Sequence, residues 1–466
     1  MTAIAPPHAG GTPPADDGAE GSREATPVSR RVEAILAPLG RPTWRWWATL
    51  AVALAGLGWF AQAWIFQLQW GLVVTGMADW GYVGGIPWGF YEGSMIWWIG
   101  IGHGGIIVSA AVRLFRMREF APIARIAELL TLASLANAGL YIVVHLGRPD
   151  RVVSSILPNL PTTLQTSPLA WDVMVITLYF VLTATYLTLT LRHDLYSVRD
   201  RLPRGFSPLY RVILVGHRKD EHAKAESMAW WLALGLIVLA PLFLHGGVIP
   251  WLFALLPGTP GWFGPVQGPQ FLAAALASAL GAVTILAYVL RRVYRWRDII
   301  DDNVFRSLSR WTGLFALLIL WLQLQKIVTG MAMAPESVGY ATYAMVNTPL
   351  YWVALAMLAV TVAHVGFQML APQRFSVART AAVGVLPLAA IGIEKILFVI
   401  EGLMYPQFSM HGPGSYSPTW VEWASLIGAL SIVALFFLIA SKAVPIVELE
   451  DDEDDAHDDE TREVPA

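Results

Sequence analysis

Cysteine is absent from all 466 positions of the sequence, and charge is scarce, since Asp, Glu, Lys and Arg together make up only 14% of the chain. Iron–sulfur clusters, disulfides and covalently attached c-type haem all need cysteine thiols. The 31 basic residues are spread among short connections and form no single patch. We therefore expect no iron–sulfur cluster and no attached haem in this chain, and no nucleic-acid partner.

Hydrophobic residues are abundant instead, at 56% of the chain with 21 Trp and a mean hydropathy of +0.53. A helix needs roughly 20 apolar residues to cross a hydrocarbon layer of roughly 30 Å. The sequence therefore predicts an all-α integral membrane protein of about ten transmembrane helices. The expected spans are residues 45–70, 90–114, 127–146, 170–191, 228–250, 269–291, 309–331, 349–371, 379–402 and 420–443.

The loops between these spans differ in basic residues. One alternate set is rich in Arg, whereas the opposite set holds only Arg148 and Arg151. Because Lys and Arg near span ends stay in the cytoplasm, both termini are expected to be cytoplasmic. We expect residues 1–43 to form a disordered tail, residues 44–444 a membrane domain, and residues 445–466 an acidic tail.

Polar groups from three consecutive spans are expected to meet near the outward membrane surface. His145 and Arg148 end the third span in VVHLGRPD, Asp172 opens the fourth, and His245 ends the fifth. A quinone head needs hydrogen-bond partners at two oxygens, and a quinol being oxidised also needs two proton acceptors, for which His and a carboxylate are suited. An Arg–Asp pair that caps helix ends at the interface, which needs no ligand, explains the pattern equally well.

Deeper polar groups predict an inward proton path in the first half of the chain. His103 lies in the second span and Glu128 near the inner end of the third. A histidine with ordinary hydrogen-bond partners in the protein core is the commoner explanation for His103 taken alone.

The second half also places ionisable residues inside spans, namely Lys326, His364, Glu394 and Lys395. They are candidates for a proton path, and an ion pair between Lys326 and Glu394 is an equally good explanation. A short echo, QLQ followed by VTGMA, begins at Gln67 and again at Gln323, but the two copies differ in spacing and carry little weight for a duplication.

Three strings, IPWGFYEGSMIWWIGIGHGG, AELLTLASLANAGLYIVVHLGRPD and SPLAWDVMVITLYF, together resemble the NrfD/PsrC family of quinone-interacting membrane subunits over roughly residues 86–180. A weaker likeness lies in SYSPTWVEWASLIGAL. Ten spans make the chain most similar to the ActC-type subunit of alternative complex III. That resemblance implies two four-helix bundles, about residues 90–250 and 269–402, flanked by a first and a last helix.

The resemblance also implies a function in a bacterial or archaeal cytoplasmic (inner) membrane. Such a subunit binds menaquinol or ubiquinol near the periplasmic face, holds no haem, and passes electrons to a periplasmic iron–sulfur subunit, with a multihaem cytochrome c and a second NrfD-like subunit as further partners. Carried over by motif, His145, Arg148 and Asp172 contribute to the quinol pocket. The string HGGVIPWLFALL after the fifth span has no carboxylate following His245, which leaves a PsrC-like subunit of a molybdopterin oxidoreductase as an alternative.

Two other classes of protein compete with this interpretation. A b-type cytochrome would ligate haem through span histidines, but no span carries a pair of them. A secondary transporter would use buried charges to bind substrate, often beside helices broken at mid-membrane, and Pro241 and Pro387 are candidate break points.

Overall fold

The protein is described by a computed structural model. It describes residues 27–76, 89–166, 168–217, 222–239, 249–255, 259, 261–262, 264, 266–332, 336–404 and 416–449. Within these ranges the regular structure is helical and contains no strand. The prediction of an all-α protein is confirmed.

Nine helices in the described ranges are long and apolar enough to cross a bilayer. They are α2 (Trp44–Trp70), α4 (Gly89–Leu114), α5 (Ala121–His145), α7 (Pro168–Ser197), α11 (Gln267–Tyr294), α12 (Asp302–Ala332), α14 (Pro349–Leu370), α15 (Val377–Leu403) and α16 (Trp420–Ala443). The fifth predicted span corresponds to α9 (His222–Leu239) and α10 (Ile249–Ala254). Residues 240–248 between them lie outside the described residues. The multi-pass membrane fold is thus confirmed.

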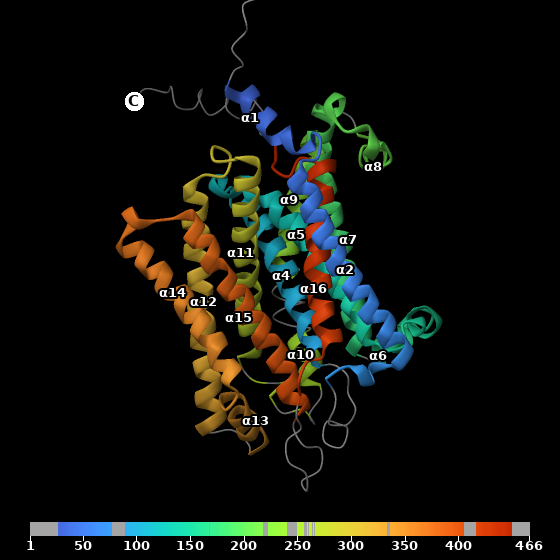
Figure 1. The fold of residues 1–466 in the computed structure, drawn as a ribbon, viewed down its shortest axis with the longest axis vertical. Coiled ribbons are helices and arrows are strands. Elements are labelled where there is room, and N and C mark those ends of the chain that lie inside the picture. Colours follow the sequence, from blue (N-terminus) through green and yellow to red (C-terminus); the bar gives the residue numbers. More distant parts are fainter. Residues whose placement is uncertain are drawn as a thin grey trace, which may run out of the picture.

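Four shorter helices lie at the two ends of the molecule (Figure 1). They are α1 (Pro27–Leu36), α6 (Leu160–Thr166), α8 (Ser207–Ile213) and α13 (Glu336–Val346). We call the two ends of the molecule the α1 end and the α13 end. Lys442, in the last turn of α16, donates to the carbonyl oxygen of Pro38 at 2.6 Å, so both ends of the described chain lie at the α1 end. That this end faces the cytoplasm stays a prediction.

The spans form two four-helix groups joined along α4 (Figure 1). In bundle one α4, α5, α7 and α9 pack around one another, and in bundle two α11, α12, α14 and α15 do the same. Helix α4 also packs against α11 and α15, which connects the bundles. Helices α2 and α16 pack against each other and flank bundle one through α5. This is the predicted arrangement of two bundles with a first and a last helix beside them.

Glycines let α4 occupy this central place. A Cβ at Gly104 would overlap the carbonyl oxygen of Ala275 on α11, and a Cβ at Gly93 would overlap the backbone of Ile396 on α15. Small residues allow such close helix packing where lipid supplies no hydrophobic driving force between helices. Accordingly, 83% of the most apolar stretch of α4 is buried inside the protein, against 17% for α2.

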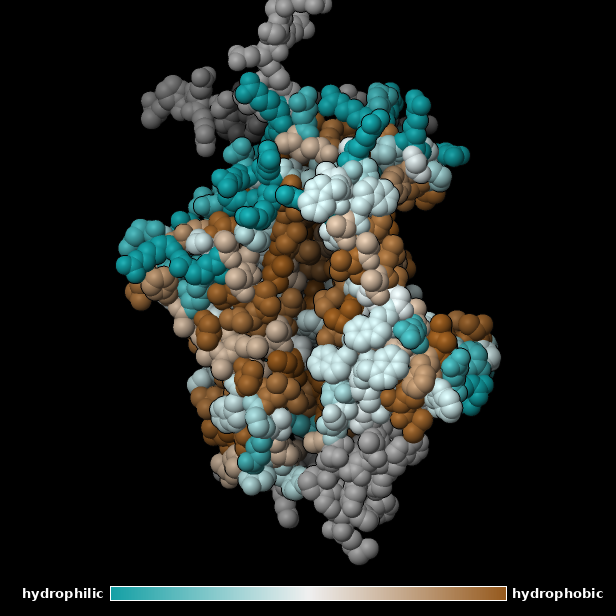
Figure 2. All heavy atoms as spheres, in the orientation of Figure 1, coloured by the Kyte–Doolittle hydropathy of each residue, from teal (hydrophilic) through white to brown (hydrophobic). Residues whose placement is uncertain are grey.

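The lipid-facing surface shows the expected zones. Hydrophobic side chains form a belt across the middle of the molecule, and hydrophilic ones gather at the α1 end (Figure 2). Exposed Trp44 and Trp47 begin α2, while exposed Trp420 and Trp423 begin α16 at the opposite end. Tryptophan prefers the membrane–water interface, so these positions bracket the hydrocarbon layer.

Parts of both predicted tails are folded. Helix α1 lies within the range 1–43, and Ile35 on it is 1% exposed while the Trp296 indole donates to the Ala34 carbonyl at 2.8 Å. After α16, residues 444–449 continue as a packed segment that we call the C-terminal strap, in which Ile446 and Val447 are buried. The prediction missed these segments because it relied on apolar runs long enough to cross a membrane, and both segments are much shorter than that. Residues 1–26 and 450–466 lie outside the described residues.

Candidate functional site

The buried imidazole of His145 faces a carboxylate. His145 is the last residue of α5 and is 2% exposed. Its Nδ1 lies 2.9 Å from the carbonyl oxygen of Tyr141, one turn earlier, and its Nε2 lies 3.9 Å from Oε2 of Glu92 in the first turn of α4. Because a carbonyl only accepts, Nδ1 carries the proton in the neutral imidazole, and Nε2 is left as an acceptor directed at Glu92.

Asp172 completes a group that we call the His145 cluster, made of Glu92, His145 and Asp172. Asp172 lies near the start of α7, is half-buried, and is an electrostatic neighbour of the Glu92 carboxylate. Three helices of bundle one therefore bring two carboxylates and an imidazole together at the α13 end. The structure places His145 against Glu92, and it makes the predicted Asp172 an electrostatic neighbour of the same Glu92.

Arg148 turns away from the cluster. Its Nε and Nη2 donate to the two carboxylate oxygens of Asp150 at 2.9 and 2.8 Å, and both side chains are exposed. These hydrogen bonds lower the pKa of the Asp150 carboxyl. The Arg–Asp surface pair considered from the sequence is therefore what the structure shows, and it holds the Arg148 guanidinium at the surface. His245, the fourth predicted quinol ligand, lies outside the described residues.

A glutamine from α2 supports the cluster from behind. Gln67 is buried, donates to the carbonyl of Val144 at 2.7 Å, and accepts from the hydroxyl of Tyr91 at 2.6 Å. It therefore ties α2 to the residues immediately before His145 and Glu92. Sequence reasoning noted Gln67 only as the start of an echoed string and did not single out Tyr91 or Glu92, although Glu92 is the one acidic residue in α4 and follows Tyr91 in the string PWGFYEG.

Another missed carboxylate, Glu422, has a structural role. It closes a capping box at the first turn of α16 and accepts from the backbone N–H groups of Thr419 and Gly76, both at 2.8 Å. The hydroxyl of Tyr416 also donates to it. Its oxygens are thus occupied by helix capping and by fixing the segment that follows α2.

The buried residues of the predicted inward proton path lie away from the His145 cluster. Glu128 on α5 is fully buried and accepts from Ser109 at 2.6 Å and from Thr190 at 3.3 Å. His103 on α4 is also fully buried and stands edge-on to the ring of Tyr179, with centroids 4.9 Å apart. Eleven residues of helix separate Glu92 from His103, a rise of about 16 Å, so a proton moving between them needs intervening water.

Bundle two holds a compensated charge pair. Nζ of Lys395 lies 3.0 Å from Oε2 of Glu394, and Oε1 of Glu394 accepts from Gln270 at 2.8 Å and from Gln323 at 3.4 Å. The same Nζ lies 3.5 Å from the centre of the Phe271 ring. The ion-pair partner of Glu394 is therefore its chain neighbour Lys395, whereas Lys326, suggested by the sequence, is an electrostatic neighbour of Glu401.

His364 belongs to a different group. Its Nε2 lies 2.8 Å from the amide nitrogen of Gln368, and Gln368 also bonds Ser309 at 2.8 Å and Thr380 at 2.7 Å. Thr380 and Glu394 are fourteen residues apart on α15, about 21 Å of helix rise, so His364 and Glu394 form no continuous chain. Helix α15 also runs unbroken through Pro387, which removes one feature expected of a transporter.

Among the described residues, no group of three or more His, Cys, Asp or Glu side chains is arranged to hold a metal ion. The His145 cluster consists of groups that accept hydrogen bonds and protons. Two carboxylates and one imidazole acceptor at a membrane surface can hydrogen-bond a polar head group and take up protons from it.

Comparison with known proteins places these residues in context. The family model described as polysulphide reductase, NrfD, matches residues 81–407, which is more than half of the chain. A putative membrane subunit of dimethyl sulfoxide reductase from Halobacterium salinarum is 32% identical over 62% of this chain and 60% of its own length. The chain thus spans less than two thirds of that relative.

Two relatives of lower sequence identity align with this chain over a larger share of both sequences. A subunit of the selenate reductase of Mesobacillus selenatarsenatis is 23% identical over 81% of this chain and 90% of its own length. The Hdr-like menaquinol oxidoreductase integral membrane subunit of Archaeoglobus fulgidus is 21% identical over 78% of this chain and 85% of its own length.

Proposed function

We propose that this chain, which belongs to the NrfD (polysulphide reductase) family, is a haem-free subunit of a respiratory redox complex that binds and oxidises quinol at the His145 cluster. The names of the three relatives, as subunits of two reductases and of a menaquinol oxidoreductase, support a redox assembly. The observation that carries the proposal is the acceptor Nε2 of buried His145 facing buried Glu92 at 3.9 Å, with Asp172 beside Glu92.

The cluster supplies what quinol oxidation needs. A quinol loses two electrons and two protons when its two hydroxyls become carbonyls. His145 Nε2 is oriented by the bond from Nδ1 to Tyr141 and accepts one proton, while the carboxylates of Glu92 and Asp172 accept the other. The distance of 3.9 Å exceeds a hydrogen bond, and a quinol hydroxyl placed near both groups can donate its one proton to either Nε2 or the Glu92 carboxylate. Asp172 is half-buried, so its side chain is partly accessible from outside the bundle.

Electrons must leave through a partner, since the sequence has no cysteine to hold a cluster. We propose a periplasmic iron–sulfur subunit at the α13 end as the acceptor, with menaquinone or ubiquinone as the bound substrate. The names of two relatives as reductase subunits support the assembly around a molybdopterin oxidoreductase. An ActC-type place in alternative complex III is the other assembly, and a co-purifying multihaem cytochrome c with a second NrfD-like subunit would identify it.

The test is quinol oxidation by the purified native complex. His145→Gln and Asp172→Asn should each lower turnover by about 100-fold or more, the range expected for loss of a positioned proton acceptor, while the partner proteins still co-purify. Asp150→Asn is the matched control, because Asp150 lies near the same membrane surface and bonds only to exposed groups in the described chain. Wild-type turnover in both cluster variants would refute the quinol site.

We further propose that protons taken up from the α1 end accompany this reaction, with Glu128 and His103 in bundle one as the buried carriers. The complete burial of both side chains within bundle one supports this part. Proton uptake measured with a pH dye during turnover in vesicles tests it. Turnover without proton uptake from the α1 side would remove this part and leave the quinol site standing.

A further inference from the structure

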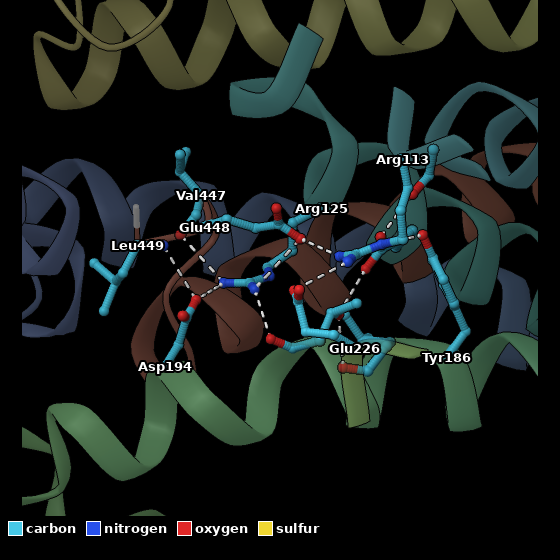
Figure 3. A network of polar contacts seen from close by, with 12 residues as sticks. Arg113, Arg125, Tyr186, Asp194, Glu226, Val447, Glu448 and Leu449 are labelled. Carbon is cyan, nitrogen blue, oxygen red and sulfur yellow. Dashed lines mark hydrogen bonds and ion pairs between the residues drawn. The ribbon is translucent and has the colours of Figure 1, made fainter. Parts of the chain in front are cut away.

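The C-terminal strap is anchored by one buried guanidinium (Figure 3). Nη1 of Arg125, which is fully buried on α5, donates to the carbonyl oxygens of Pro445 at 3.4 Å and Val447 at 3.2 Å. The same nitrogen donates to Asp194 on α7 at 2.5 Å, and Asp194 accepts from the backbone N–H of Leu449 at 3.2 Å. The strap therefore follows a fixed course over the α1 end of bundle one.

The guanidinium of Arg113 contacts the strap next to that of Arg125 (Figure 3). Oε1 of Glu448 lies 3.3 Å from Nη2 of Arg113 on α4 and 3.7 Å from Nη2 of Arg125. Arg113 also reaches Glu226 of α9 at 3.6 Å and donates to the hydroxyl of Tyr186 at 3.1 Å. Glu448 thus draws together groups from α4 and α5, on the side of the molecule where both helices approach water.

A polar cavity lies beneath these contacts. Its volume is about 100 Å³, and its lining includes Arg113, Arg125, Thr190, Glu226 and Glu448. This volume exceeds the roughly 10–15 Å³ that one buried water needs, so the cavity can hold water molecules. The charged lining offers each of them the two to four polar partners that buried water needs.

Thr190 connects this cavity to Glu128. The Thr190 side chain lines the cavity, and its Oγ1 lies 3.3 Å from Oε2 of Glu128 and 3.0 Å from the carbonyl oxygen of Leu187. A hydroxyl has one proton to donate and two lone pairs. It can therefore donate to ionised Glu128, or donate to Leu187 while accepting from protonated Glu128.

We propose that the cavity beneath the C-terminal strap is the route by which Glu128 exchanges protons with water at the α1 end, with the Thr190 hydroxyl as the link and the strap as the cover. A cavity water that carries an excess proton from the bulk, as hydronium, gives it to Oγ1 of Thr190 while the original hydroxyl proton passes to Oε2 of Glu128. This leaves a neutral water, an intact hydroxyl and a protonated carboxyl. The hydroxyl then rotates back, so no atom is lost and no electron moves. Arg113 and Arg125 keep their charges throughout. The inference deepens the proton-uptake part of the proposed function, but its tests need no quinol.

The first experiment follows exchange of the Glu128 proton. The infrared carboxyl band that Glu128→Gln removes identifies the group, and its isotope shift is timed after transfer of the purified protein to D₂O. Thr190→Val should slow this shift about tenfold, the rate equivalent of losing one hydrogen bond at the barrier. Thr188→Val is the matched control, since Thr188 lies on the same helix and its hydroxyl donates only to the backbone carbonyl of Ala184 in that helix.

An equal rate in Thr190→Val and Thr188→Val would overturn the link. Both substitutions remove a hydroxyl from α7 and keep the branched shape of the side chain, so a general effect on folding would appear in both. A slower rate in Thr190→Val alone supports the route.

The second experiment tests the cover. Glu128 is fully buried behind the strap, so a water-soluble carbodiimide should leave it unlabelled in the complete chain and in a chain ending at Leu449. A chain ending at Ala443 lacks the strap and should be labelled at Glu128, as read by mass spectrometry. Glu448→Lys, which sets a third cation against Arg113 and Arg125, should expose Glu128 without shortening the chain.

Unchanged labelling in either strap variant, when it elutes as a folded protein, would refute the cover. Labelling of the chain ending at Leu449 would refute it as well, because that chain keeps every strap contact. Quinol oxidation is measured in parallel on the same preparations. A variant that gains labelling and still binds quinol separates this inference from the quinol site.

Discussion

The two bundles bury carboxylates in opposite electrostatic surroundings. In bundle one, Glu92 faces an imidazole and lies near a second carboxylate, and no Lys or Arg side chain pairs with it in the described ranges. In bundle two, Glu394 has a lysine at 3.0 Å and two amide donors. A buried charge without a cation is costly, whereas one with a cation and hydrogen bonds is compensated.

Because their surroundings differ, we expect the two buried carboxylates to have different roles. Glu92 has no cation to hold it ionised within the described part of the chain, so its charge depends on protons that it shares with His145 and with whatever lies between them. Glu394 is neutralised within its own helix and holds α11, α12 and α15 together through Gln270 and Gln323. We therefore expect proton-linked quinol chemistry in bundle one and a mainly structural role for the pair in bundle two.

The largest expected effect is on turnover, in a matched pair of substitutions. Glu92→Gln should lower quinol oxidation by about 100-fold or more, because an amide cannot take up the proton. Glu394→Gln is the same change in the other bundle and should lower it far less. Steady-state quinol oxidation by the two purified variants measures both. Equal losses would remove the distinction between the bundles and favour a path through both of them.

The next largest effect is expected on the free energy of unfolding, and it is expected in bundle two. Lys395→Met leaves Glu394 buried without its cation and should cost about 3–5 kcal/mol of unfolding free energy. The double variant Glu394→Gln with Lys395→Met removes both charges and should recover most of that loss. Denaturant unfolding in mild detergent gives the numbers. A double variant as unstable as the single one would show that the pair is not the source of the effect.

Much of this fold could be predicted from the sequence, because long apolar runs and the distribution of Arg are properties of the chain alone. The bundle arrangement came from family resemblance, and the glycines of α4 explain it physically. The site was predicted less well. His145 and Asp172 each lie near Glu92, yet Glu92 was missed because hydropathy treats one carboxylate near a helix start as a boundary residue.

The ion-pair partners of individual charged side chains were harder to predict. From spacing alone, Arg148 has two carboxylates within reach, Asp150 beside it in the chain and Asp172 on the next span. The structure pairs it with Asp150, since a surface pair needs no desolvation of the guanidinium. Likewise Glu394 pairs with adjacent Lys395 and not with Lys326 across the bundle. Side-chain direction decides both cases, and sequence spacing does not supply it.

A smaller effect is expected at the echoed glutamines. Gln67 and Gln323 each accept a tyrosine hydroxyl, from Tyr91 at 2.6 Å and from Tyr351 at 3.0 Å. Gln67→Leu should cost about 1–3 kcal/mol by leaving the buried Tyr91 hydroxyl unpaired. Adding Tyr91→Phe should restore part of it. Thermal unfolding of the single and double variants measures the coupling, and additive losses would mean that the two side chains do not stabilise each other.

The smallest effect is expected at Arg148, and it is the sharpest test of where the quinol pocket ends. Asp150 has a lowered pKa because Arg148 bonds its ionised form. That contribution is present above the usual Asp pKa of about 3.9 and is lost as the pH falls through the lowered value. Arg148→Gln should therefore change thermal stability slightly at neutral pH, not at all in strong acid, and less at high salt.

Quinol oxidation should be the same in Arg148→Gln as in the wild type, because the guanidinium points to Asp150 at the surface. A large fall in turnover would show that Arg148 leaves Asp150 and enters the pocket when quinol binds, as the family motif implies. In that case the His145 cluster would gain a cation during the reaction, and the electrostatic contrast between the two bundles would hold only for the protein without its substrate.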